Sequence, residues 1–231
     1  MAKNTYQTYI QETPVDIYRA DFLRRGAMCA ALATRHPQLA DVGAEANAIV
    51  LQIDARRTAL QSAEDDQVRA RAMEDIEKLD VVDVYTELRR TMSAKSYDVA
   101  KLLPDAPSTL RRLGTSNFTD RANEAVSNLR VLPENDPIRV AFLGRLEKEL
   151  AEFRSADKAE DLTRVALQSG RMALTLYKSE LSQAREAQLG MIHSILKDRE
   201  KTALFTLPWR KPARSAEEAT PEEAAEEPAA P

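Results

Sequence analysis

Apolar side chains recur every three or four residues through long stretches of this chain, and that spacing limits its fold more than any other feature. In one of these rows, from Val68 to Met92, the steps average roughly 3.5 residues. This spacing is typical of long helices that pack nearly parallel or antiparallel. An earlier row consists of Leu39, Val42, Ala46, Ile49, Ile53 and Leu60, and Arg56 interrupts it once.

The composition also favours helices. Aromatic residues make up 5% of the 231 residues, and the chain has only six glycines and eleven prolines. A strand-rich fold needs more turn residues and more aromatic and β-branched side chains. The 43% of hydrophobic residues is enough for a folded core. We therefore predict an all-α protein, an elongated antiparallel bundle of about six main helices that ends in a disordered acidic tail.

Changes in local amino-acid composition divide the chain into five parts. Serines, prolines and a glycine accumulate between positions 93 and 117, which indicates a connector between two helical halves. The last residues hold no large apolar side chain, so we expect disorder there. The predicted parts are an N-terminal arm at 1–12, a three-helix half at 13–93, a connector with short helices at 94–118, a second helical half with one very long helix at 119–209, and the tail at 210–231.

Caps, prolines and polar clusters predict where the helices begin and end. Residues 13–16 (Thr-Pro-Val-Asp) start the first helix, because threonine can cap, proline suits the first turn and aspartate meets the positive dipole end. Residues 136–137 (Asp-Pro) start another helix for the same reason. The acidic residues 64–66 predict a turn. Residues 155–157 (Ser-Ala-Asp) predict a tight reversal before a helix at 158–205.

The composition excludes several kinds of site. Cys29 is the only cysteine, which rules out an intrachain disulfide and any zinc site built from several thiolates. His36 and His193 are the only histidines, and the residues three positions before them are alanine and glycine. The Glu-x-x-His pattern of carboxylate di-iron proteins is therefore missing. We predict no metal and no cofactor.

The sequence also bears on location. No apolar run follows the lysine near the N-terminus, so we expect no signal peptide. No stretch approaches the ~20 apolar residues that a membrane-spanning helix needs. A lone cysteine does not suggest an oxidising compartment. We therefore expect a soluble protein in a reducing compartment such as the bacterial cytoplasm.

Two arginines lie on apolar rows, Arg25 in the first predicted helix and Arg56 in the second. A buried guanidinium needs a carboxylate partner or a route to solvent along its stem. One hypothesis makes these arginines polar devices that fix helix register or grip an anion. With Tyr85 they would then line a ligand pocket between helices. The alternative, which we favour, places each arginine at the edge of the bundle with its charge in solvent.

Cys29 allows two interpretations. A nucleophilic cysteine needs a nearby base and an accessible, electropositive setting. Here the residue shares an apolar row with Val15 and Phe22 and stands between Met28 and Ala30. We favour the interpretation that Cys29 is a small, buried hydrophobic residue.

The end of the predicted long helix combines positive charge with large apolar side chains. Three interpretations stay open: docking of a partner protein, sealing of the bundle end by Phe205 and Trp209, and binding of anionic lipid or nucleic acid. The acidic tail competes for the same positive charges and disfavours the last of these. The candidate docking residues are Phe205, Trp209, Lys197, Arg199, Lys201, Arg210 and Lys211.

No motif in the sequence points to catalysis, since neither a phosphate-binding loop pattern nor a G-x-S-x-G elbow occurs. Long amphipathic helices often leave a strip uncovered, which a second copy can cover. We therefore predict a non-catalytic interaction, assembly or scaffold protein that has a protein partner and forms homo-oligomers. The alternatives are an enzyme or small-ligand binder with a cleft near Arg25 and Arg56, and recruitment to a membrane or nucleic acid through residues 197–214.

Overall fold

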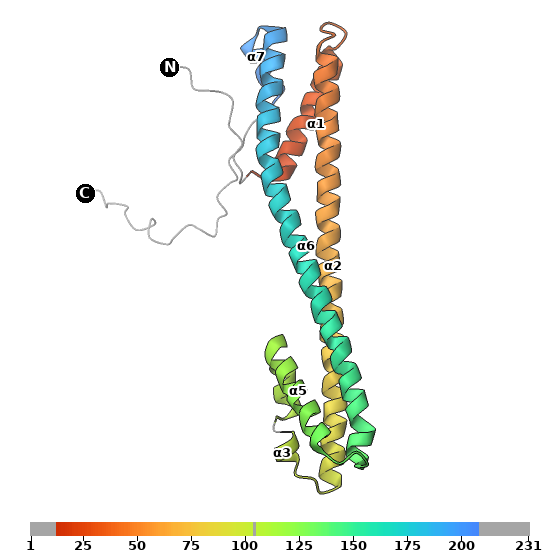
Figure 1. The fold of residues 1–231 in the computed structure, drawn as a ribbon. Helices are drawn as coiled ribbons and strands as arrows, with labels where there is room; N and C mark the ends of the chain where they lie inside the picture. Colours follow the sequence, from red (N-terminus) through yellow and green to blue (C-terminus); the bar gives the residue numbers. More distant parts are fainter. Residues whose placement is uncertain (1–12, 104, 208–231) are drawn as a thin grey trace, which may run out of the picture. The chain divides into compact units, whose positions relative to one another are not determined.

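The computed structural model describes residues 13–103 and 105–207, which form helices joined by short connections (Figure 1). No strand occurs in these two ranges, so the all-α prediction is confirmed. The predicted arm at 1–12 and tail at 210–231 lie outside the described residues. The helices are α1 (Val15–Leu32), α2 (Leu39–Ala94), α3 (Val99–Leu102), α4 (Pro107–Arg112), α5 (Thr115–Val131), α6 (Pro137–Leu196) and α7 (Arg199–Ala203).

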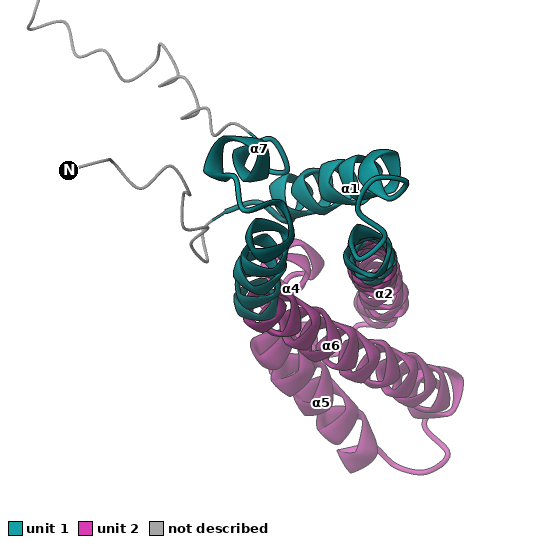
Figure 2. Ribbon diagram, turned by 90° about the horizontal axis from the view of Figure 1, so that it is seen from above, with its two compact units in different colours: residues 1–53, 178–231 teal, residues 54–177 magenta. Residues whose placement is uncertain are grey.

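The chain forms two compact units, which Figure 2 colours separately. Unit 1 contains residues 1–53 and 178–231, and unit 2 contains residues 54–177. Both boundaries fall inside a long helix, because α2 and α6 each contribute one part to each unit. The segment at 94–118 lies wholly in unit 2, where it supplies α3, α4 and the start of α5. None of the described helices is both long and apolar enough to cross a membrane.

In unit 2, α2 and α6 run in opposite directions. Glu87 of α2 pairs with Arg145 of α6 at 2.8 Å, and Glu64 of α2 pairs with Arg171 of α6 at 3.0 Å. The partner's number therefore falls along α6 as the residue number rises along α2. This confirms antiparallel packing for the two long segments of the unit.

The core of unit 2 forms where α5 packs beside α2 and α6 (Figure 1). Phe118 of α5 meets Phe153 of α6 edge-on, with their ring centres 4.8 Å apart. The buried apolar side chains on α2 lie between Val81 and Met92, and those on α6 lie between Ile138 and Phe153. The core therefore occupies only part of the length over which α2 and α6 belong to this unit.

In unit 1, α1 packs against the first part of α2 and the last part of α6. The buried apolar cluster there joins Cys29, Leu39, Val42, Leu189, Ile192 and Phe205. Two glycines allow α1 and α2 to approach closely. A Cβ atom on Gly43 would lie 2.9 Å from Cβ of Cys29, and one on Gly26 would overlap the side chain of Asn47. Any larger residue at these positions would force its neighbour to move.

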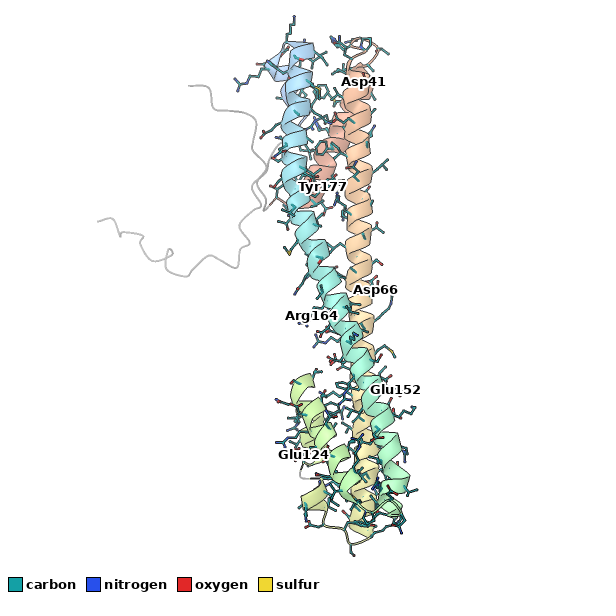
Figure 3. All side chains as sticks on the ribbon, in the orientation of Figure 1. Asp41, Asp66, Glu124, Glu152, Arg164 and Tyr177 are labelled. Carbon is teal, nitrogen blue, oxygen red and sulfur yellow. The ribbon has the colours of Figure 1, made fainter. Side chains whose placement is uncertain are left out.

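The turn predicted at residues 64–66 is wrong, because α2 runs unbroken for 56 residues. Figure 3 labels Asp66 on this continuous helix. Acidic residues cost only about 0.7 kcal/mol or less each in a helix, far less than proline. Their side chains also pair along the helix: Gln61 donates to Asp65 at 3.0 Å, and Arg69 donates to Asp66 at 3.0 Å. Pairs at spacings of three and four residues support a helix.

The reversal predicted at residues 155–157 is also wrong, because α6 continues through them for 60 residues in all. Serine and aspartate only weakly disfavour a helix, and alanine favours it most. The predicted start of this helix at 136–137 is confirmed. The carboxylate of Asp136 accepts a hydrogen bond from the backbone N–H of Ile138 at 2.8 Å, which caps the first turn.

The helix predicted at 158–205 ends earlier than expected, at Leu196. Lys197 adopts the left-handed region with φ 52°, which ends the helical path. Asp198 then caps α7, because its side chain accepts from the backbone N–H groups of Glu200 and Lys201. The long helix is therefore real, but it begins and ends earlier along the chain than the sequence indicated.

We expect the substitution Asp65→Pro to lower the free energy of unfolding by about 3 kcal/mol, because proline removes a hydrogen bond inside a helix and clashes with the preceding turn. The exposed Asp65→Ala variant is the control and should change this free energy by less than ~1 kcal/mol. Chemical denaturation followed by circular dichroism measures both. Equal stability of the proline variant and the parent would mean that residues 64–66 form a turn after all.

Candidate functional site

Unit 1 contains a buried ionic cluster around Arg25. The side chains of Arg25 and Asp21 are both 0% exposed, and they pair at 2.6 Å. The other terminal nitrogen of Arg25, Nη1, donates to the side-chain carbonyl of Gln188 at 3.0 Å. The charged group also lies 4.8 Å from the centre of the Phe22 ring. Our expectation that Arg25 reaches solvent at the bundle edge is therefore wrong: the carboxylate one helical turn away allows it to be buried.

Asp21 is the shared acceptor of this cluster. Its Oδ2 atom also accepts from Nε of Arg185 at 3.2 Å, and its Oδ1 atom accepts from the backbone N–H of Leu207 at 2.9 Å. One carboxylate thus connects α1, α6 and the residues that follow α7. Because the charges of Arg25 and Arg185 both pair with Asp21 inside the protein, the cluster is suited to fixing helix register rather than to capturing an anion.

Arg56 and Tyr85 lie at separate places in unit 2. Arg56 is exposed, and its guanidinium lies 4.0 Å from the centre of the ring of Tyr177, which Figure 3 labels on α6. Tyr85 is buried, and its hydroxyl donates to the backbone carbonyl of Asp105 at 3.0 Å. Burial raises the pKa of Tyr85 to about 12, so its phenol stays protonated at neutral pH.

These positions do not form the common pocket that the sequence allowed. Arg56 and Tyr85 both belong to the continuous helix α2, and at about 1.5 Å per residue they lie roughly 44 Å apart along it. A pocket for a small ligand is far shorter than this distance. The edge interpretation holds for Arg56, which is exposed and stacks its guanidinium on the ring of Tyr177.

The structure also decides between the two interpretations of Cys29. The side chain is 0% exposed and belongs to the apolar cluster of unit 1. Burial raises the pKa of the thiol, and the nearby charge of Arg25 opposes this only in part. A protonated, inaccessible thiol is a poor nucleophile. The residue therefore acts as part of the core.

The candidate docking residues near the C-terminus differ in their surroundings. Phe205 is only 1% exposed and lies in the core of unit 1, as the sealing interpretation expects. The side chain of Arg24 adds a contact there, since its Nε donates to the carbonyl of Leu204 at 2.8 Å. Lys197, Arg199 and Lys201 are exposed. Trp209, Arg210 and Lys211 lie outside the described residues.

Three carboxylates of unit 2 lie close enough together to share a cation. The oxygens of Glu77 and Asp80 on α2 and of Glu149 on α6 lie within 4.8 Å of one another. Burial and the neighbouring carboxylates raise the pKa of Glu77. Lys148 partly compensates this charge, because its amine lies 3.2 Å from Glu149. Sequence patterns missed the group because two distant helices supply it.

A shallow groove of about 280 Å³ lies beside these carboxylates. It is lined by acidic side chains of α2, among them Asp80, Asp83 and Glu87, and by Arg145 of α6. The hydrogen bond from Arg145 lowers the pKa of Glu87, so this carboxylate stays charged and paired. The groove is thus polar, and its one arginine, Arg145, is already paired with Glu87.

The outer face of α6 is an exposed apolar row of unit 2 that the core does not use. We give this name to Leu162, Val165, Ala166, Ser169, Met172, Ala173 and Leu176, all of which are exposed. Leu162, Met172 and Leu176 have 64%, 68% and 68% of their surface in solvent. The seven residues repeat with heptad spacing, contain no charge and extend over about 21 Å of helix.

The outer face points away from α2. The side chain of Leu167 is buried, and a residue five positions away on a helix points about 140° away from it. Leu162 and Met172 each stand at this spacing from Leu167. Two neighbouring arginines are engaged away from this face, since Arg164 pairs with Asp161 and Arg171 pairs with Glu64 of α2. The apolar strip itself is left in solvent.

An apolar row along a helix need not be buried over its whole length. On α6, Leu162 and Val165 are exposed, whereas Tyr177 is buried. In the same way, Val68 and Ile76 of α2 are exposed, whereas Met92 at the end of their row is buried. Separating the apolar positions of α6 by their angle around the helix would have revealed two rows instead of one.

Comparison of the chain with protein-family models, with curated proteins and with solved structures finds no match.

We expect Asp21→Asn to lower the free energy of unfolding by roughly 3 to 5 kcal/mol, because two buried guanidinium groups would lose the negative charge that they share. The matched control is Glu45→Gln, which removes an exposed carboxylate of α2 and should change stability by less than about 0.5 kcal/mol. Urea denaturation measures both variants. Similar losses in the two variants would contradict the role of Asp21.

We expect the thiol of Cys29 to resist labelling in the native protein at pH 8, because burial blocks access and a raised pKa keeps the thiol protonated. The same reagent should label one thiol per chain in denaturant. Rapid labelling of the folded protein, at the rate of a free cysteine, would show that the site is accessible and reactive.

Proposed function

We propose that this protein is a non-catalytic assembly component that binds protein through the outer face of α6 and associates with itself. The observation that carries this proposal is the uncharged, exposed row from Leu162 to Leu176. Single exposed apolar residues are ordinary on protein surfaces. A continuous row with heptad spacing is different, because each member can enter a gap between side chains of a second helix.

The energetics favour a partner on this face. Full burial of one leucine or methionine side chain contributes about 1.5 to 3 kcal/mol, and three such side chains here have more than half of their surface in solvent. No charge on the face would have to lose its hydration on binding. Association is therefore favoured by apolar burial without an opposing cost from buried ions.

The other functions considered from the sequence receive less support. The guanidinium of Arg25 is held by Asp21 and Gln188, which leaves it no role in gripping a ligand. Phe205 is buried in the core of unit 1, so it does not offer an aromatic anchor for docking or for a membrane surface. The outer face of α6 is the better candidate because its side chains are already in solvent.

We expect the double substitution Met172→Glu with Leu176→Glu to weaken self-association by at least about 100-fold, because charges would replace apolar side chains at the interface. Sedimentation velocity over a range of concentrations should give a dimer for the parent and a mass near 25.8 kDa for the variant.

The matched control is Val131→Glu. This valine ends α5 and is 84% exposed, so the same change of chemistry occurs away from the outer face. The control should dimerise like the parent, and circular dichroism should show equal helix content in all three proteins. A parent that stays monomeric at high concentration, or a control that dissociates as much as the double variant, would overturn the proposal.

A further inference from the structure

We propose that residues 198–207 form a strap that closes over the apolar core of unit 1 and opens separately from the rest of the fold. The strap comprises α7, its capping residue Asp198 and the residues that follow as far as Leu207 (Figure 2). Its opening, which is smaller than global unfolding, is the step that admits a reagent to the buried thiol of Cys29. This inference concerns unit 1 and goes beyond the assembly function proposed for the outer face of α6.

The backbone of the strap is held to α1 at two points. Nε of Arg24 donates to the carbonyl of Leu204 at 2.8 Å, and the backbone N–H of Leu207 donates to Oδ1 of Asp21 at 2.9 Å. Asp21 and Arg24 stand three residues apart and are therefore neighbours on the surface of α1. The two strap residues are also three positions apart. Both hydrogen bonds end on the backbone of the strap, so its path over α1 is fixed whatever side chains it carries.

Between these two points, the side chain of Phe205 closes the core. It is 1% exposed and belongs to the same apolar cluster as Cys29 of α1, Val42 of α2 and Ile192 of α6. One aromatic side chain of the strap thus completes a cluster that three other helices share. When the strap opens, this side chain leaves the cluster and a path to Cys29 forms.

The strap has little that holds it apart from these contacts with unit 1. Two of its ten residues, Thr202 and Phe205, are buried. Its helix, α7, has five residues, and a helix this short is not stable by itself in water. Segments with little buried surface open at a lower cost in free energy than the core of a fold. Opening of the strap is therefore expected to precede global unfolding.

The hinge of the strap lies at Lys197, whose φ of 52° ends the helical path of α6. Before the hinge, the N–H of Lys197 donates to the carbonyl of His193 at 2.8 Å. After it, the hydroxyl and the backbone N–H of Thr202 both donate to the carbonyl of Asp198. A rotation at the hinge leaves all of these bonds intact. The 3.5 Å contact between the Thr202 hydroxyl and Nδ1 of His193 crosses the hinge and is lost on opening.

Labelling of Cys29 in the parent protein at increasing urea concentrations tests the strap. The dependence of an opening reaction on urea grows with the surface that it exposes. We expect slow labelling that changes little at low urea, where the strap opens, and a steep rise where global unfolding takes over. A labelling rate that follows global unfolding, measured by circular dichroism, over the whole range of urea would overturn the proposal.

A pair of variants at Leu207 tests the bond to Asp21. Leu207→Pro removes the N–H group that Asp21 accepts, whereas Leu207→Ala keeps it. Without urea, Cys29 should be labelled at least about tenfold faster in the proline variant than in the alanine variant, because a hydrogen bond to a charged group is lost. Both variants should keep the helix content of the parent. Equal labelling rates would show that this bond does not hold the strap closed.

A second pair tests the aromatic side chain. We expect Phe205→Ala to speed the labelling of Cys29 by at least about 100-fold, because a buried ring is removed from the closed state. The matched control is Leu204→Ala at the neighbouring position, which is 53% exposed and should change the rate by less than about threefold. The faster labelling should keep its weak dependence on urea. A dependence as steep as that of global unfolding would mean that the whole unit opens, and it would overturn the strap.

Discussion

A helix that packs against one neighbour can bury only one strip of its surface, and this constraint explains most of unit 2. Where α5 packs beside α2 and α6, three helices enclose a core that includes Phe118 and Phe153. The core on α6 ends at Phe153, although the helix continues. Beyond that point α6 buries Leu167 and Tyr177 but leaves a second apolar row in solvent. That row is the basis of the assembly function proposed for the protein.

In unit 1, a buried ionic cluster holds several helices in one register. The carboxylate of Asp21 accepts from two arginines and from the backbone of Leu207. Such a cluster contributes little net stability, because burying charge is costly, but it penalises every arrangement that separates its members. The close approach at Gly26 and Gly43 adds to this, since a side chain at either position would crowd Asn47 or Cys29 where α1 and α2 meet.

Sequence patterns predicted the helical class, the first helix and the start of α6, because prolines and the Asp136 cap act locally. The threonine cap expected for the first helix is wrong, since Thr13 makes no capping hydrogen bond and Pro14 stands at the N-cap of α1. They failed at residues 64–66 and 155–157, where polar residues resembled turns although none of them is proline or glycine. A helix tolerates such residues when its neighbours extend it on both sides. The candidate sites depended still more on distant contacts. The partners of Arg25 include Gln188 on another helix, and no local pattern connects these two residues.

The sequence by itself determined that this chain is helical, that its apolar residues repeat at nearly 3.5, and that its one cysteine and two histidines fit no common metal site. Only the tertiary structure decided which apolar rows are buried. A periodic row indicates that a helix has an apolar face. The helix α6 has two such faces, and α2 covers only one of them. Burial depends on which helices pack together, and the spacing within one helix carries no information about that choice.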